Sequence, residues 1–548
     1  MVIDMLKIPG INKIIDELRT RIPPVETPSL IIYKDGDNYY IKDGLTGQIE
    51  LYGTDASTVI QQAIDAVSNA GGGRIFIKKG TYNIETSIKP KSNVIIEAED
   101  STGTIFNLTQ PFIFQGLGEP SVENFAIING RFIIKANVRV MWLRETARNI
   151  LIKGCRLEID PNIGTYAPSF GMRFEKADNV VIDSVTILGA GSDTIHLTGS
   201  KIAVINSYLD GMLAFANGIY ASSVTNLFVY NSVFIGWKHN GIMLSGVSSR
   251  VVIAGNYFYN CADGVDHDGN VDHEVIAYNV FHDCGTGGDG SISLTPISPN
   301  KVSSVIIIGN IFRGENAGMY GVHIASSENV IVEANVYMNG GGASFFIRIY
   351  NSRYVNVKNN VAYMPGYGVI LPSGPIQVID SQNVRLEDNI IIGGPDDRNP
   401  IIRIASSDVG ATSWVFIRRN YLRPNLYGNP TRESSGIVFA DLNATNIYIE
   451  ENRFDFGLND KLIVNPPPGT VIRRNIGYPT EASGVATIVA GSTRVTVSHG
   501  LATAPSKVLV TPYANIRAWV ENITGTSFDI ATDIAPTVDV NVAWYAEI

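Results

Sequence analysis

The chain has 548 residues and a formal net charge of −10 at a pI near 5.3, with 45% hydrophobic and 17% charged residues. This acidic balance disfavours nucleic acid as the main partner, because neutralising phosphates requires a basic surface. No apolar run reaches the ~18 residues that a spanning helix needs, so no membrane span is expected. Residues 1–22 mix acids and bases throughout, so we expect no conventional secretion signal in them.

Residues 1–52 are expected to form an arm and a small β unit. The amphipathic pattern of residues 11–21, ended by Pro23 and Pro24, predicts a short helix that acts as a mobile arm or an oligomer contact. In residues 29–52, segments with strand-like composition alternate with Asp-Gly turns, which predicts short paired strands.

Residues 53–84 predict a helix followed by a strand. Ser57 is the expected N-cap, and the glycines at 71–73 end the helix. The apolar face of this helix comprises Ile60, Ala63, Ile64 and Val67. Such a helix can cap the open end of a β-solenoid, whose first coil would otherwise expose its core and strand edges.

Eleven asparagines recur at intervals of 23 to 32 residues, nearly all after a strand rich in valine or isoleucine. They are Asn206, Asn231, Asn256, Asn279, Asn310, Asn335, Asn360, Asn389, Asn420, Asn452 and Asn475. A repeat of this size is typical of a solenoid. We therefore expect an all-β fold, a right-handed parallel β-helix over residues 53–478, with the asparagine amides stacked in one row.

The segment from Gly53 to Ile84, DxxxxIQxAIDAV followed by GGGxIFIxxGTY, resembles the entry to the pectate-lyase-like superfamily. That superfamily includes polysaccharide lyases, polygalacturonases and phage tailspikes. With the asparagine repeat, the resemblance covers about residues 53–478. It implies the β-helix fold and a glycan partner and leaves the reaction open.

The second strand of each coil carries an outward row of unusual composition. It reads Arg173, His196, Tyr220, Met243, Asp266, Ser293, His323, Arg348, Ile370 and Arg403. Two of the seven histidines and three arginines in one row favour a ligand site along the solenoid. The residues expected to hold the glycan are Arg173, His196, Tyr220, Lys238, His239 and Arg348.

Residues 261–273, CADGVDHDGNVDH, concentrate ionisable side chains beside this row. An inverting glycosidase needs a carboxylic acid and a base carboxylate about 6.5 to 9.5 Å apart, which neighbouring coils can supply. Asp263, Asp266 and Asp289 are the acid and base candidates, and His323 is expected to orient them. Asp263 could equally be a turn former, and the histidines ordinary surface residues.

Asp266, Asp268 and Asp272 lie in a segment rich in oxygen ligands that could hold calcium. This segment lacks the spacing and the closing glutamate of an EF-hand. Loops with this composition often bind nothing. Hydrolysis requires no cofactor, so calcium is the one metal considered.

The polygalacturonase family carries N-T-D-G-[IV]-D, G-D-D, G-H-G and R-I-K in this order. Here CADGVD resembles the first element with Asp263, GGDGSISL the second with Asp289, and IRIY the last with Arg348. The resemblance implies acid–base catalysis by these aspartates. The chain departs from the family pattern at Cys261, Gly290, Tyr320 and Tyr350, where the family has asparagine, aspartate, histidine and lysine. The catalytic set of the family is therefore incomplete here.

Residues 479–548 read as five or six alternating strands and predict a small antiparallel β-sandwich. This region resembles C-terminal modules of phage tail fibres and glycan-binding proteins in its motifs VSHGL, Ala504-Pro505 and VLVTP. Trp519, His499 and Trp544 could contact sugar or form the core of this domain.

The sequence thus favours a carbohydrate-active enzyme that hydrolyses a polysaccharide, acidic or uronate-containing, on the outward row. One alternative is a lyase in which Lys238, His239 or Arg348 abstracts a proton. The other is a non-catalytic glycan-binding spike or adhesin, for which the resemblance implies a homotrimer. All three predict an extracellular, virion-surface or cell-surface location.

Overall fold

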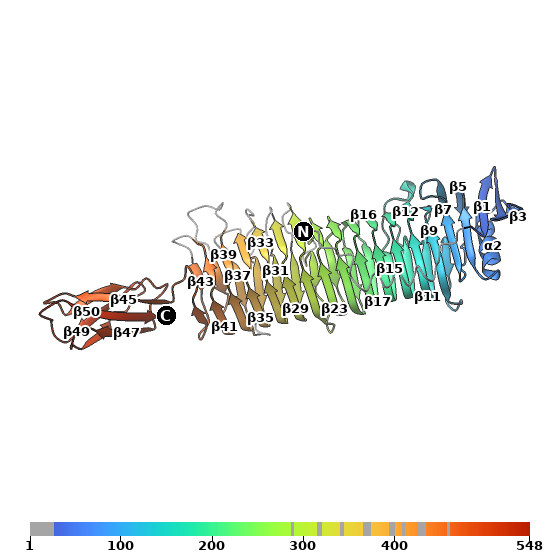
Figure 1. Cartoon of the computed structure of the whole chain (residues 1–548). Helices are drawn as coiled ribbons and strands as arrows, with labels where there is room; N and C mark the ends of the chain where they lie inside the picture. The colour runs from blue at the N-terminus through green and yellow to red at the C-terminus, as the bar shows by residue number, and fades with distance from the viewer. Residues whose placement is uncertain are drawn as a thin grey trace. The chain divides into compact units, whose positions relative to one another are not determined.

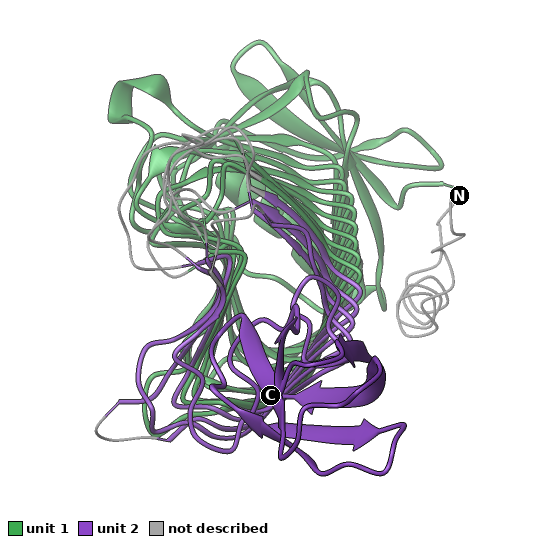
Figure 2. Cartoon of the chain, turned by 90° about the vertical axis from the view of Figure 1, so that its left-hand side faces the viewer, with its two compact units in different colours: residues 1–352 green, residues 353–548 purple. Residues whose placement is uncertain are grey.

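The computed structural model describes residues 27–286, 290–314, 320–339, 345–364, 374–393, 400–407, 411–424, 435–456 and 461–548. The chain divides into two compact units, residues 1–352 and 353–548 (Figure 2). The helix predicted over residues 11–21 lies outside the described residues. Within the described ranges, no helix is long and apolar enough to cross a membrane.

A β-meander and a helix precede the first coils of unit 1 (Figure 1). Antiparallel strands β1 (Leu30–Asp35), β2 (Asn38–Asp43) and β3 (Ile49–Gly53) form the predicted β unit. Strand β1 also pairs in parallel with β4 (Gly73–Ile77), which joins the meander to the solenoid.

Helix α2 (Ala56–Asn69) buries the predicted apolar face of Ile60, Ala63, Ile64 and Val67. Its N-cap is Asp55, which accepts hydrogen bonds from the backbone N–H groups of Ser57 and Thr58, so the expected cap at Ser57 is wrong. The Ser57 hydroxyl instead accepts the backbone N–H groups of Glu85 and Thr86, which ties the helix to the strand that follows it.

The coils of unit 1 run through three parallel sheets, named a, b and c here, in the chain order c, a, b. Strands β11 (Met141–Lys153), β13 (Met172–Asp183), β15 (Asp193–Ile205) and β17 (Asn217–Tyr230) pass through sheets a and b in turn. Sheet a also contains β8 (Ile113–Gln115), β19 (Asn240–Ser245), β22 (Asp263–His267), β25 (Ile292–Leu294), β28 (Val322–Ala325) and β31 (Ile347–Tyr350). Sheet b also contains β4, β6 (Val94–Ala98), β9 (Val122–Ile128), β20 (Val247–Ala254), β23 (Asn270–Ala277), β26 (Val302–Ile308) and β29 (Ser327–Glu333).

Sheet c closes each coil of unit 1. Its strands are β5 (Gly80–Ile84), β7 (Thr104–Leu108), β10 (Arg131–Ile134), β12 (Arg156–Ile159), β14 (Thr186–Leu188), β16 (Tyr208–Ala214), β18 (Val233–Trp237), β21 (Tyr257–Tyr259), β24 (Val280–His282), β27 (Ile311–Gly314) and β30 (Val336–Asn339). The prediction of an all-β parallel solenoid is confirmed.

Stacked aromatic rings fill the core inside sheet c. Phe234, Phe258, Phe281 and Phe312 lie with successive ring centroids 4.8, 4.8 and 5.2 Å apart, close to the spacing of strands in a sheet. A Cβ at Gly264 would lie 2.5 Å from the Phe281 ring, so this position needs glycine for the close approach.

Nine of the eleven repeated asparagines form buried hydrogen-bonded rows, four in unit 1 and five in unit 2. Within each unit, every side-chain amide donates to the next asparagine's Oδ1 at 2.9 to 3.0 Å. Asn206 and Asn231 are exceptions: they are exposed, with φ of 52° and 49°, one position before the row. Ser207 and Ser232 take the buried places, and the expectation of a single row is wrong for those two coils.

Replacing Asn256 by leucine should lower the free energy of unfolding by about 1 to 3 kcal/mol. The buried side chain accepts from the Ser232 N–H at 2.9 Å and donates to the carbonyl of Val229 at 2.9 Å, and leucine does neither. Asn256→Ser is the matched control and should cost less, because serine fills this place in two neighbouring coils. Urea unfolding measures both, and equal losses for the two variants would contradict the argument.

Unit 2 continues the parallel pattern with its own strands. In sheet b they are β32 (Arg353–Lys358), β35 (Gln382–Glu387), β38 (Ser413–Arg418), β41 (Thr445–Glu450) and β44 (Val471–Arg473). In sheet a they are β34 (Ile376–Ile379), β37 (Pro400–Ala405), β40 (Ser435–Phe439) and β43 (Lys461–Val464), and in sheet c β33 (Val361–Met364), β36 (Ile390–Gly393), β39 (Tyr421–Arg423) and β42 (Arg453–Phe454).

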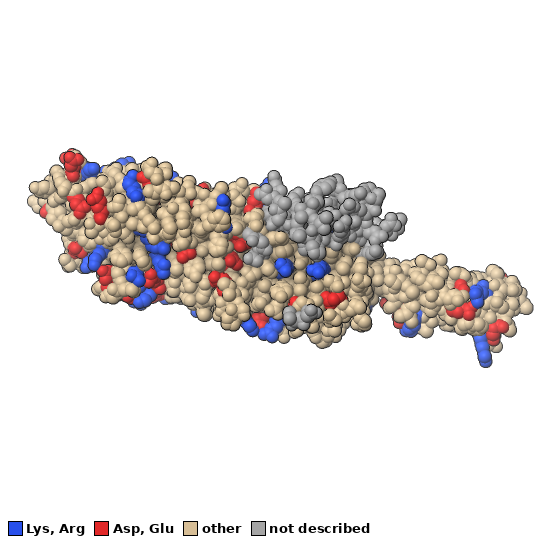
Figure 3. Space-filling model, turned by 180° about the vertical axis from the view of Figure 1, so that it is seen from behind, with Lys and Arg blue, Asp and Glu red and all other residues tan. Residues whose placement is uncertain are grey.

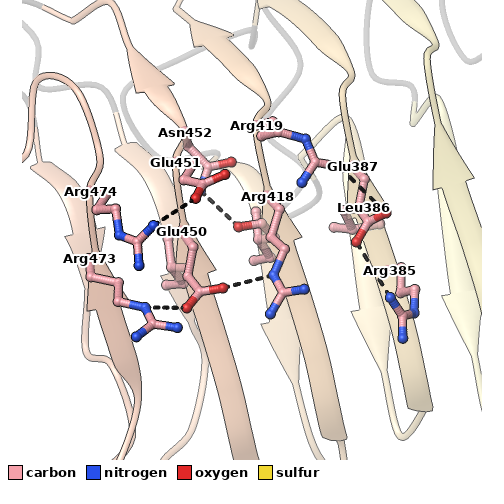
Figure 4. Close-up of polar contacts among 12 residues, drawn as sticks. Arg385, Leu386, Glu387, Arg418, Arg419, Glu450, Glu451, Asn452, Arg473 and Arg474 are labelled. Carbon is pink, nitrogen blue, oxygen red and sulfur yellow. Dashed lines mark hydrogen bonds and ion pairs between the residues drawn. The ribbon is translucent and has the colours of Figure 1, made fainter.

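The outer side of sheet b in unit 2 carries paired charges. Figure 4 shows the Glu450 carboxylate between Arg418 and Arg473, at 2.8 and 2.5 Å. Arg419 adds a two-pronged contact to Asp388 at 2.8 and 2.9 Å. These cations are matched by carboxylates, which indicates a structural role for them.

The chain ends in two small antiparallel sheets, as predicted. One contains β45 (Glu481–Ile488), β50 (Val540–Glu547) and β47 (Lys507–Pro512), and the other β46 (Arg494–Ser498), β49 (Ser527–Thr532) and β48 (Ala518–Glu521). His499 is buried and stacks on Phe528, and Trp544 packs edge-on against the same ring. Trp519 is exposed and Trp544 partly buried, so Trp519 is the most accessible of the three aromatic candidates.

Candidate functional site

Strand pairing in unit 1 brings the predicted outward row together. Register partners run in the order Arg173, His196, Tyr220, Met243, Asp266, Ser293, His323 and Arg348, one residue from each successive coil. Neighbours in such a row lie about 4.8 Å apart. Ile370 lies outside the described residues; in unit 2, Gln377 is the register partner of Arg403.

The row is more buried than a plain surface strand. Arg173, His196, Tyr220, Asp266 and Arg348 are half-buried, whereas Met243, Ser293 and His323 are buried. The His323 ring meets the Phe345 ring edge-on at 5.9 Å. Partial burial strengthens polar contacts with a ligand, because less water competes for them.

A polar network joins four side chains at the N-terminal half of the row. His196 Nδ1 lies 3.3 Å from Asp193 Oδ2, and Asn217 donates to the other oxygen of Asp193 at 3.2 Å. His239 Nδ1 lies 2.9 Å from Asn217 Oδ1. Burial raises the pKa of Asp193, but hydrogen bonds from His196 and Asn217 outweigh burial and lower it overall. The carboxylate is therefore ionised and fixes the orientation of His196.

Two predicted binding residues, Lys238 and His239, are exposed where the chain passes from sheet c to sheet a. The Lys238 ammonium lies 5.6 Å from the ring of Phe215, which is exposed. Because Asn217 Oδ1 is an acceptor, it fixes a proton on His239 Nδ1 and leaves Nε2 as the basic nitrogen.

The structure separates the predicted catalytic aspartates. Asp263 is 8% exposed, and its Oδ1 accepts the backbone N–H of Gly290 in the next coil at 3.3 Å. On an extended strand, residues three apart face opposite sides, so Asp263 does not share the face of Asp266. Asp268 is two residues from Asp266 and directly follows His267, the last residue of β22. Asp289 lies outside the described residues.

The three aspartates proposed for calcium do not converge. Asp272 belongs to β23 in sheet b, where its carboxylate contacts His273 at 2.5 Å and Ser303 at 2.8 Å. The described part of the chain contains no group of three or more histidine, cysteine, aspartate or glutamate side chains that could hold a metal ion. Asp272 thus lies on another sheet than Asp266, and the calcium site stays a prediction.

One histidine of the acidic segment lies inside the solenoid. His267 and Glu274 are both fully buried, with His267 Nε2 2.6 Å from Glu274 Oε2 and Nδ1 2.8 Å from the Ser293 carbonyl oxygen. Burial lowers the pKa of His267, but the charge and hydrogen bond of Glu274 raise it overall. Both ring nitrogens face acceptors, so the ring is an imidazolium.

Sequence reasoning missed the N-terminal extension of the outward row. Trp142 of β11 is the register partner of Arg173, and Phe114 of β8 is the partner of Trp142. The signal was present, since Met141-Trp142-Leu143 repeats the pattern of an inward apolar residue followed by an outward one.

On the face in Figure 3, acidic and basic side chains are intermixed and large areas carry neither, so no basic patch suited to nucleic acid appears there.

A family model described as "Right handed beta helix region" matches residues 148–294. No curated protein matches the chain. Among solved structures, a double mutant of the tailspike protein of E. coli bacteriophage HK620 is similar at 13% identity and a TM-score of 0.44, over 97% of this chain and 99% of that one. The A-module of a mannuronan C-5 epimerase of Azotobacter vinelandii has 15% identity and a TM-score of 0.35, over 78% and 96%. PfbA, a surface adhesin of Streptococcus pneumoniae, has 15% identity and a TM-score of 0.39, over 71% and 90%. The chain is thus a right-handed parallel β-helix protein with a C-terminal antiparallel β-sandwich.

Proposed function

We propose that this protein binds an acidic polysaccharide along the outward row of unit 1 and cleaves it there. The observation that carries the proposal is the unbroken register from Trp142 to Arg348, which aligns aromatic, cationic and acidic side chains in one line. A linear glycan matches such a line, since aromatic rings pack on sugar rings and arginines bind carboxylates in pairs of hydrogen bonds.

Hydrolysis is the first candidate reaction. Asp266 lies near the end of β22 and Asp268 directly follows that strand, so these two carboxyl groups are the candidates for the acid and base of glycoside cleavage. The Oδ1 atom of Asp268 is buried and has no hydrogen-bond partner, so this carboxyl group has capacity for a ligand. One carboxyl group would protonate the leaving oxygen, and the other would activate water or attack the sugar.

Elimination is the second candidate, favoured by the arrangement of Asp193, His196 and Tyr220. Asp193 holds His196 through Nδ1, which leaves Nε2 to accept a proton, and the Tyr220 ring lies 5.0 Å from the His196 ring. His196 would remove the C5 proton of a uronate while that electron pair forms the C4–C5 double bond. The C4–O bond would break, and Tyr220 would protonate the departing oxygen.

A panel of acidic and neutral polysaccharides, incubated with the full chain, separates these candidates. Hydrolysis and elimination both release reducing ends, but only elimination creates an unsaturated, ultraviolet-absorbing product. Parallel incubations with chelator test whether either reaction needs calcium. If the protein binds a glycan but releases no reducing ends, only the non-catalytic glycan-binding spike remains. If it neither binds nor cleaves any glycan, the proposal is refuted.

We also propose that three copies of this chain associate through the outer side of sheet b in unit 1, on a virion or cell surface or in the extracellular medium. An apolar row runs there through Val181, Ala203, Phe228, Val252, Val275, Ile306 and Ile331. Part of it forms an apolar cluster of its own. Val181, Ala203 and Phe228 are buried, whereas Val252, Val275, Ile306 and Ile331 are at least partly exposed, and an exposed apolar row favours association.

Ile306→Glu should convert a wild-type trimer to monomer in sedimentation velocity, because a charge would have to be buried in the contact. Ile311→Glu is the matched control, since Ile311 is equally exposed but lies on sheet c. A monomeric wild-type protein, or dissociation of both variants alike, would overturn this assignment.

A further inference from the structure

Three arginines surround one tryptophan at the N-terminal end of the outward row. The guanidinium carbons of Arg144, Arg173 and Arg139 lie 5.0, 5.8 and 6.0 Å from the centre of the Trp142 ring. Phe114 meets the same ring edge-on at 5.7 Å, from the preceding coil. The aromatic ring thus gathers three cations that would otherwise repel one another.

The Glu175 carboxylate contacts both this tryptophan and two of the arginines. Glu175 Oε1 accepts the Trp142 indole N–H at 2.9 Å and lies 3.1 Å from Arg173 Nε and 3.7 Å from Arg144 Nε. Asp193, the next acid along the row, is already held by His196 and Asn217. The three guanidinium groups therefore share the Glu175 carboxylate, and the next acids, Asp193 and Glu145, are also engaged by His196 and by Lys176.

Arg139 is the most buried of the three arginines, so its positive charge is the most unfavourable to leave unneutralised. Its side chain is 7% exposed, and it donates only to the carbonyl oxygens of Phe170 and Asp193, at 3.4 Å each. Within the described residues it forms no ion pair. Burial and the neighbouring charge of Arg173 lower its pKa, and the opposing charges of Asp193 and Glu175 do not restore it. A buried cation whose nearest carboxylates are held by other groups is unfavourable, and a bound oxyanion would relieve it.

We propose that Arg139, Arg144 and Arg173, gathered on Trp142, form a subsite for the carboxylate or sulfate group of an acidic sugar. The inference rests on the proposed function and names the substrate class of the same row. Guanidinium groups present paired N–H donors that match a planar carboxylate or two oxygens of a sulfate. Arg173 is the register partner of His196, so a sugar held here lies one coil from the Asp193, His196 and Tyr220 group.

Inorganic sulfate is the first probe, because its binding does not depend on any glycan activity. Calorimetric titration of the full chain, at constant ionic strength set with chloride, should show saturable binding. Arg173→Gln should weaken it more than about 10-fold, since it removes charged hydrogen-bond donors. Arg156→Gln is the matched control, because Arg156 is also a strand arginine paired with a glutamate, but on sheet c. No binding to the wild type, or equal weakening by both substitutions, would overturn the subsite.

Oligosaccharides then identify the natural group. An oligouronate, its methyl ester and a sulfated oligosaccharide of equal length are titrated against the wild type and Arg173→Gln. The subsite predicts that one charged ligand binds more tightly than the neutral ester and that Arg173→Gln removes this preference. A preference that survives in the variant would refute the subsite. Sulfate binding without binding of any glycan would refute the proposed function and leave the anion site standing.

Discussion

Asp266→Asn is expected to lower turnover by at least about 100-fold on any polysaccharide that the wild type hydrolyses, the scale of general acid–base catalysis. Asp266 lies in the outward row between Met243 and Ser293, and its carboxylate oxygen accepts the His267 backbone N–H at 2.8 Å. Asparagine keeps that acceptor, so the variant should fold normally while losing the proton-transferring group. Initial rates of reducing-end release measure the effect.

Asp272→Asn is the matched control, because Asp272 lies in the same acidic segment as Asp266 but on β23 of sheet b. Its turnover should equal that of the wild type. Asp268→Asn should resemble Asp266→Asn if the two carboxylates act as a pair. Wild-type turnover in both the Asp266 and Asp268 variants would remove the hydrolase candidate and leave elimination or binding.

Glu274→Val is expected to lower the free energy of unfolding by about 3 to 5 kcal/mol, because it leaves the His267 imidazolium buried without a counter-charge. Both residues are fully buried. The register partners of Glu274 are Val251 and Val305, and those of His267 are Leu244 and Leu294, so the pair replaces apolar residues of the regular core. Urea unfolding measures the loss.

The double variant His267→Leu with Glu274→Val should recover that loss and reach or exceed wild-type stability by up to about 4 kcal/mol. Leucine and valine restore the apolar rows that run through the neighbouring coils. The double variant also loses the His267 contact to the Ser293 carbonyl oxygen, which offsets part of the gain. A double variant less stable than Glu274→Val alone would contradict the account of the pair.

The sequence by itself determined the parallel solenoid, the capping helix, the terminal sandwich and the outward row. Strand alternation and a coil-sized repeat are local properties, and each coil mainly contacts the coils next to it. For this reason the alignment from Arg173 to Arg348 agrees with every strand register along it.

Only the tertiary structure decided what each ionisable residue faces. His267 and Asp266 are adjacent in the sequence, yet one lies in the core and the other on the outer face, because successive strand residues point to opposite sides. Asn206 and Asn231 sit one position out of the buried row, since that position takes a left-handed conformation which asparagine tolerates. Arg139, Arg144 and Arg173 meet only because two successive coils bring their strands side by side around Trp142.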